Sequence, residues 1–536
     1  MVRSKNPDLI FDEVLEERAE RVSRQYFEEP EFIDLDRVTL FVTHKCNLKC
    51  KYCNGPHLSK DPEARKLLKR DITLEQYRNM IDDWALNGLK NIHFTGGEAT
   101  MNLHLHEFIE LATYKGISST LTTNGMANNQ FYKKLIDNGL NEIRISIDTA
   151  IDEEFDELVG VKGACQRVKG NIDYLANLRD KQGKDIFIIL NACIGTFNID
   201  KIKTTLDSLI ELRPDDVKFL VVAEEGEQVH SKASRKLVDE LVAYAKGKAP
   251  DYELLEKKIR GMFRKYSFGL KGQASKHIMQ QCFIPLTERT LDAEGIYPCS
   301  IYLRYRGEPL ASVNASFEEQ QKAINEFVEN HDCREDEICI DNCTNCCKMY
   351  NIEVNKKIRK QEEAKNMVKI NIGNITQDEI KRFETMYKVI NKIRSRDFPF
   401  IIIKPHGVKH QDEIIKYLQN QGIIIADIAS IKRWNELSLF LYYKPGRDVE
   451  HRLARNKAYS EIEHPNRAIF LMTEKEVPEK KLSRIKRELR EWYGEKVGKF
   501  YYKGEEHFFR SNCIHSPDYK DLARESKVIK FFLSND

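Results

Sequence analysis

Three cysteines, Cys46, Cys50 and Cys53, stand near the amino end of the chain at Cys-x3-Cys-x2-Cys spacing. A structural zinc site normally takes four protein ligands, whereas three thiolates on one short loop can hold three corners of a cubane [4Fe-4S] cluster. The fourth iron is then open and can bind a substrate. The alternative from this motif alone is a zinc loop or a chance group of reduced cysteines.

A second group of cysteines follows much later in the chain. Together the two groups contain ten of the 13 cysteines, and in a reducing compartment such clustering predicts metal ligands or free thiols rather than disulfides. The second group consists of Cys282, Cys299, Cys333, Cys339, Cys343, Cys346 and Cys347. The remaining three, Cys165, Cys193 and Cys513, stand alone and are interpreted as buried apolar residues.

Length and composition describe a large globular protein. The chain has 536 residues, which predicts two to four domains, and its formal net charge of +2 gives no global attraction to nucleic acid or to a membrane. The first residues lack the pattern of a signal peptide, and no apolar run reaches the roughly 18 residues of a membrane span. We therefore expect a cytoplasmic protein without a membrane partner.

The cysteine loop follows the first of six short apolar runs that alternate with amphipathic helical stretches such as 74–84. The runs are 38–42, 91–94, 118–122, 142–147, 185–194 and 217–222. Alternation of strands and helices predicts parallel pairing, and six units predict an α/β fold with a partial (β/α)6 TIM-like barrel. Functional side chains should then gather at the carboxyl ends of the strands.

Polar residues and glycines stand at those ends. Gly96, Gly97 and Glu98 follow the second run, and glycines let backbone approach a ligand while the acid can pair with an ammonium group. In the fourth run Ser146 and Asp148 point the same way, because side chains alternate along a strand. A hydroxyl beside a carboxylate suits the hydroxyls of a ribose, although a satisfied polar pair at a strand end has the same appearance.

These elements, in this order, resemble the radical SAM superfamily. The resemblance implies that the open iron chelates the amino and carboxylate groups of S-adenosylmethionine (SAM), and that an electron from the cluster breaks the S–C5′ bond to give a hydrogen-abstracting 5′-deoxyadenosyl radical. It also implies an electron donor such as flavodoxin or ferredoxin. The chain departs from the family at Ala99, where proline is frequent. The implied SAM contacts are Tyr52, Gly96, Gly97, Glu98, Asn124, Ser146, Asp148 and Asn198.

The second cysteine group resembles the SPASM or twitch extension of radical SAM enzymes. Cys282 and Cys299 flank Gly295, and a Cys-x5-Cys-x3-Cys run begins at Cys333. The full SPASM pattern has a cysteine where this chain has Asn330, and the spacing after Gly295 is one residue short. The resemblance implies at least one auxiliary [4Fe-4S] cluster. The alternative is a zinc site whose ligands are Cys339, Cys343, Cys346 and Cys347.

The last part of the chain resembles nucleoside diphosphate kinase over about 397–536, which implies a ferredoxin-like α/β sandwich. An apolar strand ends in Lys404-Pro-His406-Gly-Val, where the family has Asp in place of His406, and Asn512 precedes His515 as in its active-site segment. Carried over, His515 is a catalytic nucleophile and Lys404, Asn512 and His515 bind nucleotide. The family's orienting glutamate falls at Ser526, or at Glu525 after a one-residue shift.

The predicted organisation has five parts: an N-terminal extension (1–37), the barrel (38–280), an auxiliary iron–sulfur region (281–350), a helical connector (351–396) and the kinase-like domain (397–536). The predicted function is a radical SAM enzyme that abstracts hydrogen from a small-molecule substrate, a nucleoside or phosphate-bearing nucleotide. Alternatives are a SPASM-type peptide or protein maturase and a nucleotide-sensing regulatory iron–sulfur protein. Kinase-like domains of this type often assemble, so oligomers are within the prediction.

Overall fold

The structure, a computed structural model, divides into two compact units, Met1–Val354 and Asn355–Asp536. Each unit is described here by itself. The described residues are 12–28, 35–222, 225, 229, 235–252, 255–256, 259, 271–272, 281–365, 368–371, 375–392, 399–441, 449–462, 468–475, 477–478, 481–482, 484–486, 488–489, 495–502, 505–512, 514–515 and 522–533.

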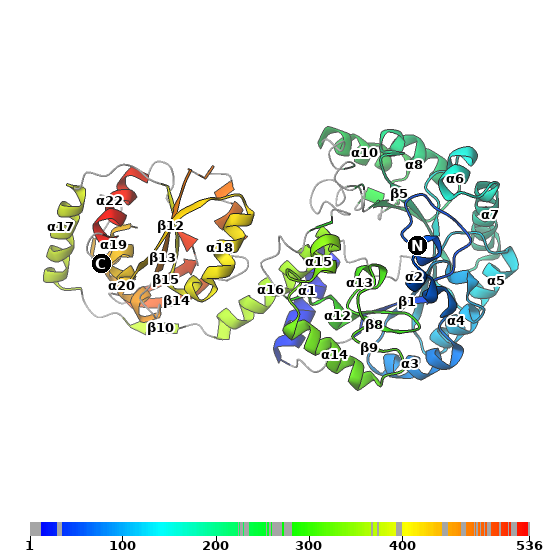
Figure 1. The fold of residues 1–536 in the computed structure, drawn as a ribbon, viewed down its shortest axis with the longest axis horizontal. Helices are drawn as coiled ribbons and strands as arrows, with labels where there is room; N and C mark the ends of the chain where they lie inside the picture. Colours follow the sequence, from blue (N-terminus) through cyan, green and yellow to red (C-terminus); the bar gives the residue numbers. More distant parts are fainter. Residues whose placement is uncertain are drawn as a thin grey trace. The chain divides into compact units, whose positions relative to one another are not determined.

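A nine-stranded sheet in the order β6-β5-β4-β3-β2-β1-β7-β8-β9 forms the centre of the first unit (Figure 1). Strands β1 to β6 all pair in parallel, so the predicted α/β alternation is confirmed. These strands are β1 Arg37–Thr43, β2 Asn91–Gly96, β3 Ser118–Thr123, β4 Glu142–Ser146, β5 Phe187–Ile194 and β6 Asp216–Val221. The helices among them are α2 Pro62–Lys66, α3 Leu74–Leu86, α4 Leu105–Tyr114, α5 Asn129–Asp137, α6 Asp152–Val159, α7 Ala164–Gln182, α8 Ile202–Ile210 and α10 Arg235–Lys248.

The helices lie along the outer face of this curved sheet (Figure 1), as expected when each strand returns to its neighbour through a helix. Helix α3 shows how the sequence sets such an element. Thr73 and Gln76 form a reciprocal capping box at its start, and Tyr77, Met80, Ile81 and Trp84 bury one stripe. The six parallel strands thereby present their carboxyl ends at one rim.

The cysteine-rich region joins the barrel at the free edge of β1. Strand β7 (Glu288–Leu291) pairs with β1 in parallel, and β8 (Gly295–Tyr297) and β9 (Ala311–Ser312) continue the sheet antiparallel. The helices of this region are α12 Ile284–Thr287, α13 Ser300–Arg304, α14 Phe317–Asn330, α15 Glu337–Asn342 and α16 Asn345–Lys365. The auxiliary region is therefore an extension of the barrel sheet, which brings its thiols to the edge of the same unit.

A buried ion-pair group ties helix α1 (Asp12–Glu28) to this junction. Arg18 Nη1 lies 2.6 Å from Glu288 Oε1, and Arg37 Nη2 lies 2.8 Å from Glu288 Oε2. Arg18 Nε also lies 3.1 Å from Asp36 Oδ2. Burial raises the pKa of the Glu288 carboxyl, but the two arginines outweigh it and hold that pKa below its usual range. The charges thus link α1, β1 and β7.

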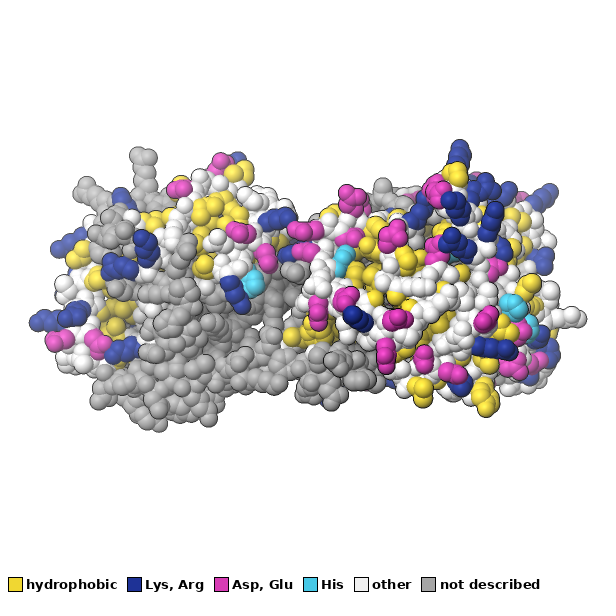
Figure 2. All heavy atoms as spheres, turned by 60° about the horizontal axis from the view of Figure 1, so that its bottom comes forward, with side chains coloured by type: hydrophobic (Ala, Val, Ile, Leu, Met, Phe, Trp, Pro, Cys, Tyr) yellow, Lys and Arg dark blue, Asp and Glu magenta, His cyan; other side chains and the backbone are white. Residues whose placement is uncertain are grey.

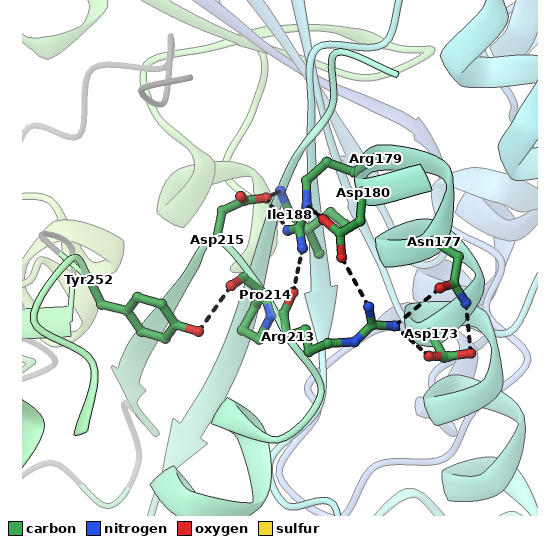
Figure 3. A network of polar contacts seen from close by, with 9 residues as sticks. All are labelled: Asp173, Asn177, Arg179, Asp180, Ile188, Arg213, Pro214, Asp215 and Tyr252. Atoms are coloured by element: carbon green, nitrogen blue, oxygen red, sulfur yellow. Dashed lines mark hydrogen bonds and ion pairs between the residues drawn. The ribbon is translucent and has the colours of Figure 1, made fainter. Parts of the chain in front are cut away.

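A polar network closes the opposite end of β5 and β6, at their amino termini (Figure 3). Arg179 Nη1 lies 2.8 Å from Asp215 Oδ2, and that oxygen also accepts the backbone N–H of Ile188 at 2.8 Å. Arg213, which has a positive φ of 58°, binds Asp173 and Asp180 of helix α7. In a barrel, this end serves stability rather than chemistry.

The second unit contains two sheets. The four-stranded one has the order β12-β13-β11-β16 with antiparallel pairs, and the three-stranded one has the order β10-β14-β15. The segment predicted as a helical connector thus also contains strand β10. The strands are β10 Val368–Asn371, β11 Phe400–Ile403, β12 Ile425–Ile431, β13 Ala468–Thr473, β14 Glu495–Tyr502, β15 Glu505–Asn512 and β16 Ile514–His515. The helices are α17 Gln377–Asn391, α18 Gln411–Asn420, α19 Trp434–Leu441, α20 Val449–Ile462 and α22 Leu522–Leu533.

The four-stranded sheet lies between helices (Figure 1), as an α/β sandwich requires. Helices α17, α19 and α22 contribute to one apolar core on a single face, with Phe400 and Phe470 from the sheet. Among the described helices of the whole chain, none is long and apolar enough to cross a membrane. On the face in view, Figure 2 shows lysine and arginine as well as aspartate and glutamate side chains on the described parts of both units.

Candidate active site

The cysteine loop follows β1 and is held by backbone bonds to the end of helix α6. Lys49 N donates to Val159 O at 2.9 Å, and Lys51 N donates to Leu158 O at 3.0 Å. Within the loop, Cys53 N donates to Cys50 O at 3.0 Å, which makes a tight turn between two of the thiols. The loop geometry is therefore set by the neighbouring βα unit as well as by its own sequence.

Gly96 and Gly97 bring the turn after β2 against this loop. Gly96 has a φ of +144°, and a Cβ there would stand 2.1 Å from Thr43 O. A Cβ on Gly97 would stand 2.3 Å from Lys45 O. The close approach allows Gly97 N to donate to Thr43 O and Glu98 N to donate to Lys45 O, at 2.8 and 2.7 Å. Both glycines are needed because the two backbones touch.

The carboxylate of Glu98 ties the ends of β2 and β3 together. One oxygen accepts from Thr100 Oγ1 at 2.6 Å and from Thr123 Oγ1 at 2.7 Å, and the other accepts from Asn124 N at 2.6 Å. The side chain is buried, and burial raises the pKa of this carboxyl although its hydrogen bonds lower it. Glu98 is thus a fixed acceptor in the wall behind the cysteine loop.

Asn124 connects the end of β3 to the first cysteine. Its Nδ2 donates to Asn47 Oδ1 at 2.7 Å and lies 3.9 Å from Cys46 Sγ, while its Oδ1 accepts from Met126 N at 3.0 Å. An amide N–H aimed at a thiol is the kind of outer contact that orients a metal ligand. The residues predicted after the second and third strands therefore surround the cysteine loop.

The three thiols lie within electrostatic range of one another. Burial first, and then the charges of Cys53, Asp148 and Cys46, raise the pKa of Cys50 to about 12. Burial also raises the pKa of Cys46, with Glu98 and Cys53 adding to the effect. Because the pKa values of Cys46 and Cys50 are raised, a cation that binds these thiols must displace their protons. This donor set fits an iron–sulfur cluster or a soft metal.

Asp148 lies behind the loop at the end of β4, and protein donors already contact both its oxygens. Tyr52 OH donates to Oδ2 at 2.6 Å, and Cys193 N donates to Oδ1 at 2.7 Å. Burial raises the pKa of Asp148 to about 6, although these hydrogen bonds lower it. The ring of Tyr52 also stacks on Phe197, with centroids 6.0 Å apart. Burial and Asp148 raise the pKa of the Cys193 thiol, so Cys193 belongs to this polar group and not to an apolar core.

Ser146 and Asn198 complete the predicted SAM contacts. Ser146 is half-buried and lies beside Asn191 in the β4–β5 register. Asn198 Nδ2 donates to Cys193 O at 2.8 Å, and its Oδ1 accepts from Gly195 N at 2.9 Å, so this amide braces the loop after β5. Its direct contact with SAM stays a prediction.

The second cysteine group also converges. Burial raises the pKa of Cys339, and the charges of Cys282, Cys299 and Cys333 add to the effect. Cys343 likewise lies within electrostatic range of Cys282, Cys299 and Cys339, and its thiol forms a hydrogen bond with the thiol of Cys347. The side chain of Cys346 lies outside the described residues. Thiols separated by long stretches of sequence therefore meet in one pocket.

Side chains link this pocket to the barrel. Asn351 Nδ2 lies 3.5 Å from Cys282 Sγ, and Phe283 N donates to Asn351 Oδ1 at 2.8 Å. His44, two residues before Cys46, has its Nε2 2.9 Å from Asp292 Oδ2 in the β7–β8 turn, and both residues are buried. The His44–Asp292 contact joins the two cysteine regions directly.

In the second unit, the half-buried His515 pairs with the buried Glu525, with Nε2 and Oε2 2.7 Å apart. Burial lowers the pKa of His515 and Lys404 lowers it further, against the raising effect of Glu525. Lys404 is itself buried. The carboxylate beside His515 is therefore Glu525, which corresponds to the alignment with a one-residue shift and not to the alignment that places Ser526 there. The side chain of Asn512 and all of Cys513 lie outside the described residues.

The model of the radical SAM superfamily matches residues 40–209, which run from within β1 into α8 and include the cysteine loop. Residues 40–209 are a radical SAM domain. A radical SAM domain is an enzyme's domain that holds a [4Fe-4S] cluster and SAM, and the three half-buried thiols of the loop are the donor set for that cluster.

The curated relatives of this chain differ in what their names say they act on. Fe-coproporphyrin III synthase of Methanosarcina barkeri is 32% identical over 206 residues, which cover 37% of this chain and 48% of the relative. GTP 3′,8-cyclase of Clostridium perfringens is 27% identical (36% and 57% covered), and PqqA peptide cyclase of Rhizobium meliloti is 26% identical (36% and 48% covered). The chain thus spans about half the length of these curated relatives.

Among solved structures, SuiB of Streptococcus suis bound to the precursor peptide SuiA is 15% identical to this chain, with a TM-score of 0.44. The match covers 63% of this chain and 77% of that one.

Proposed function

We propose that Cys46, Cys50 and Cys53 hold a [4Fe-4S] cluster whose fourth iron binds SAM. One observation carries the proposal: the three thiols converge at the rim of the barrel. There Asn124 contacts Cys46, and the Gly96–Gly97 turn packs on the loop. A closed four-thiolate site is not what this loop offers among the described residues. When bound, the cluster supplies one electron that cleaves the S–C5′ bond, so that methionine leaves and the adenosyl group takes a hydrogen atom from the substrate.

In this proposal the protein's own residues orient SAM and keep the loop in place. The turn Gly96–Glu98 presents backbone and a fixed carboxylate toward the methionine end, and Ser146 and Asp148 stand where the ribose is expected. Because the Oδ1 and Oδ2 atoms of Asp148 already accept bonds from Cys193 N and Tyr52 OH, the ribose must share these acceptors. Tyr52 and Asn198 brace the pocket. The electron comes from a small donor protein such as flavodoxin or ferredoxin.

We further propose that the second cysteine group holds at least one auxiliary [4Fe-4S] cluster. Five thiols lie within electrostatic range of one another: Cys282, Cys299, Cys333, Cys339 and Cys343. Cys347 adjoins Cys343. This set exceeds the four ligands that one cluster needs. A zinc site formed by Cys339, Cys343, Cys346 and Cys347 is the competing assignment, and metal analysis separates the two.

For the substrate we propose a phosphate-bearing nucleotide held by the second unit. The supporting observation is the His515–Glu525 pair with Lys404 in electrostatic range, because an oriented imidazole and a cation suit phosphate oxygens. The likeness of this unit to nucleoside diphosphate kinase, and nucleophilic catalysis by His515, are part of the same proposal. A SPASM-type peptide maturase is the second candidate, favoured by the convergence of the auxiliary thiols.

The test is anaerobic reconstitution with iron and sulfide, followed by dithionite, SAM and one candidate substrate at a time. Release of 5′-deoxyadenosine that rises at least tenfold with one nucleoside triphosphate supports the nucleotide proposal. His515→Ala and Lys404→Ala should then weaken the dependence on that nucleotide without affecting SAM cleavage in its absence. Stimulation by a peptide alone contradicts it and favours the maturase.

A further inference from the structure

His331 lies beside the auxiliary thiols. It follows helix α14 and precedes Cys333 by two residues, and its Nε2 lies 3.7 Å from Cys339 Sγ. The SPASM pattern places a cysteine at the position of Asn330, and His331 is the next residue. An imidazole nitrogen therefore lies beside the thiols in a chain that lacks that cysteine.

The ring is held in place by its neighbours. It stacks on Phe327 with centroids 4.1 Å apart and planes 20° apart, and the edge of Tyr302 lies at 6.4 Å. Tyr302 OH donates to Asp336 Oδ2 at 3.0 Å, and Asp336 Oδ1 accepts Cys339 N at 2.8 Å. The aromatic contacts fix the imidazole, and Asp336 fixes the backbone of the thiol that the imidazole faces.

Three kinds of chemistry suit a histidine nitrogen beside a cysteine sulfur. In a cubane each iron takes one protein ligand, so two ligand atoms stand on different irons and are kept well beyond contact distance. A separation of 3.7 Å between Nε2 and Sγ is too short for that. It fits either a hydrogen bond or the edge of a tetrahedral site on one ion, which is ~3.6 Å for zinc bond lengths.

The hydrogen bond is favoured over the single-ion site. A single-ion site would take Asp336 as its third ligand, because Asp336 lies near both His331 and Cys339. However, Asp336 Oδ1 already caps the N-terminus of helix α15, and its Oδ2 accepts a hydrogen bond from Tyr302. Cys339 also lies within electrostatic range of Cys282, Cys299 and Cys333, whose charges raise its pKa. If Cys339 binds the same cluster as those cysteines, its thiolate can accept an N–H bond from His331 without His331 acting as a ligand.

We propose that His331 Nε2–H donates a hydrogen bond to the Cys339 thiolate and thereby raises the reduction potential of the auxiliary cluster. The inference rests on the proposed auxiliary cluster and concerns the tuning of that cluster. A sulfur that accepts an N–H bond gives less electron density to iron, so the reduced cluster is stabilised. His331 is thus a positioning residue that acts through Cys339.

The test uses the full-length chain with Cys46, Cys50 and Cys53 all changed to alanine, which leaves only the auxiliary site. His331→Phe keeps the stacking on Phe327 and removes the N–H donor, whereas His331→Gln retains one. Asn330→Ala is the matched control, because Asn330 Nδ2 donates to Glu326 O and not to sulfur. Each protein is reconstituted, and its iron and zinc contents are measured. The reduction potential of its cluster is then determined by a redox titration in which electron paramagnetic resonance follows the reduced cluster.

We expect unchanged iron content in all variants and a lower potential in His331→Phe. The reduced-to-oxidised ratio at a fixed potential should fall about tenfold, which equals ~59 mV for one electron. His331→Gln should recover much of the shift, and Asn330→Ala should show none. An unchanged potential in His331→Phe overturns the inference alone. Spectra that show an imidazole nitrogen bound directly to iron also overturn it. The same holds if the protein binds one zinc per chain and loses it when His331 is replaced. If the triple alanine variant with His331 intact takes up no iron, the auxiliary-cluster proposal is overturned and the inference with it.

Discussion

The two cysteine groups contrast in how the fold brings their thiols together. Cys46, Cys50 and Cys53 lie on one loop after β1, and backbone bonds from the β2 turn and helix α6 fix that loop. The auxiliary thiols come from 282 to 347 and are gathered by helices and side chains such as Asn351 and His331. The first site depends on local geometry, and the second on packing between distant segments.

In the proposed function, the loop leaves one coordination position of its cluster free, whereas the second group has more thiols than one cluster needs. A short loop can offer only as many ligands as its turns allow, so the open position is built into the motif. An assembled pocket adds thiols from several elements, and neighbours such as His331 then adjust the site without acting as ligands. Each of the following changes tests one side of the comparison.

The largest expected effect is on the loop. Cys50→Ala removes the thiol whose pKa is raised by both other thiols of the loop, and SAM cleavage should fall to background. The measurement is 5′-deoxyadenosine released by the reconstituted, dithionite-reduced protein. His515→Ala, in the other unit, should keep cleavage near the wild-type rate. A Cys50→Ala protein that cleaves SAM normally would show that the loop does not carry the cluster.

The next effect is on the assembled pocket. Cys299→Ala should lower iron content by about one cluster, yet SAM cleavage without substrate should stay within several-fold of wild type, because the loop is built independently. Burial and Cys282 raise the pKa of the Cys299 thiol to about 12, so this residue belongs to the pocket. Cys165→Ala, outside both groups, is the control for iron content. Loss of all iron in Cys299→Ala would contradict the independence of the two sites.

A smaller effect tests the close approach behind the loop. In Gly97→Ala the new Cβ would meet Lys45 O at 2.3 Å, so the turn and the loop must separate, at a cost of ~1–3 kcal/mol. Thermal unfolding should shift down and iron incorporation should drop. Gly170→Ala in helix α7 is the matched control, since nothing lies within 4 Å of its added Cβ. That change should be neutral or slightly stabilising. Equal behaviour of the two variants would remove the packing argument.

The smallest effect is a pH dependence from Asp148, the carboxyl beside the loop thiols. Its pKa of about 6 in the folded protein lies above the usual ~3.9. A carboxyl with a raised folded pKa stabilises the fold below pH ~4, and this contribution is lost as pH rises through about 6. In the metal-free protein, Asp148→Asn should therefore gain in melting temperature over wild type between pH 5 and pH 8. A difference independent of pH would mean that Asp148 is not buried as described.

The sequence was sufficient for the features that depend on local order. Six apolar runs predicted β1 to β6 within a few residues, because each strand is buried on both faces and carries a continuous apolar signal. The radical SAM assignment of the barrel is confirmed by the family match. The assignment of individual SAM contacts and of the five-part domain division stays a prediction.

Other features depend on contacts that a linear pattern does not encode. The chain gave no sign that Cys193 joins Tyr52 and Asp148, because its neighbours along the strand are apolar. Alignment without gaps placed Ser526 opposite His515, whereas helix α22 turns Glu525 toward it. The pairing of β7 with β1 and the position of His331 beside Cys339 likewise arise from packing between distant segments.

The most direct test of the central claim is the electron paramagnetic resonance spectrum of the reduced, reconstituted protein with and without SAM, alongside the Cys46/Cys50/Cys53 triple alanine variant. The wild type should show two reduced cluster signals, one of which changes on addition of SAM and is absent from the variant. A SAM-sensitive signal that survives in the triple variant, or none in the wild type, would contradict an open iron at this loop.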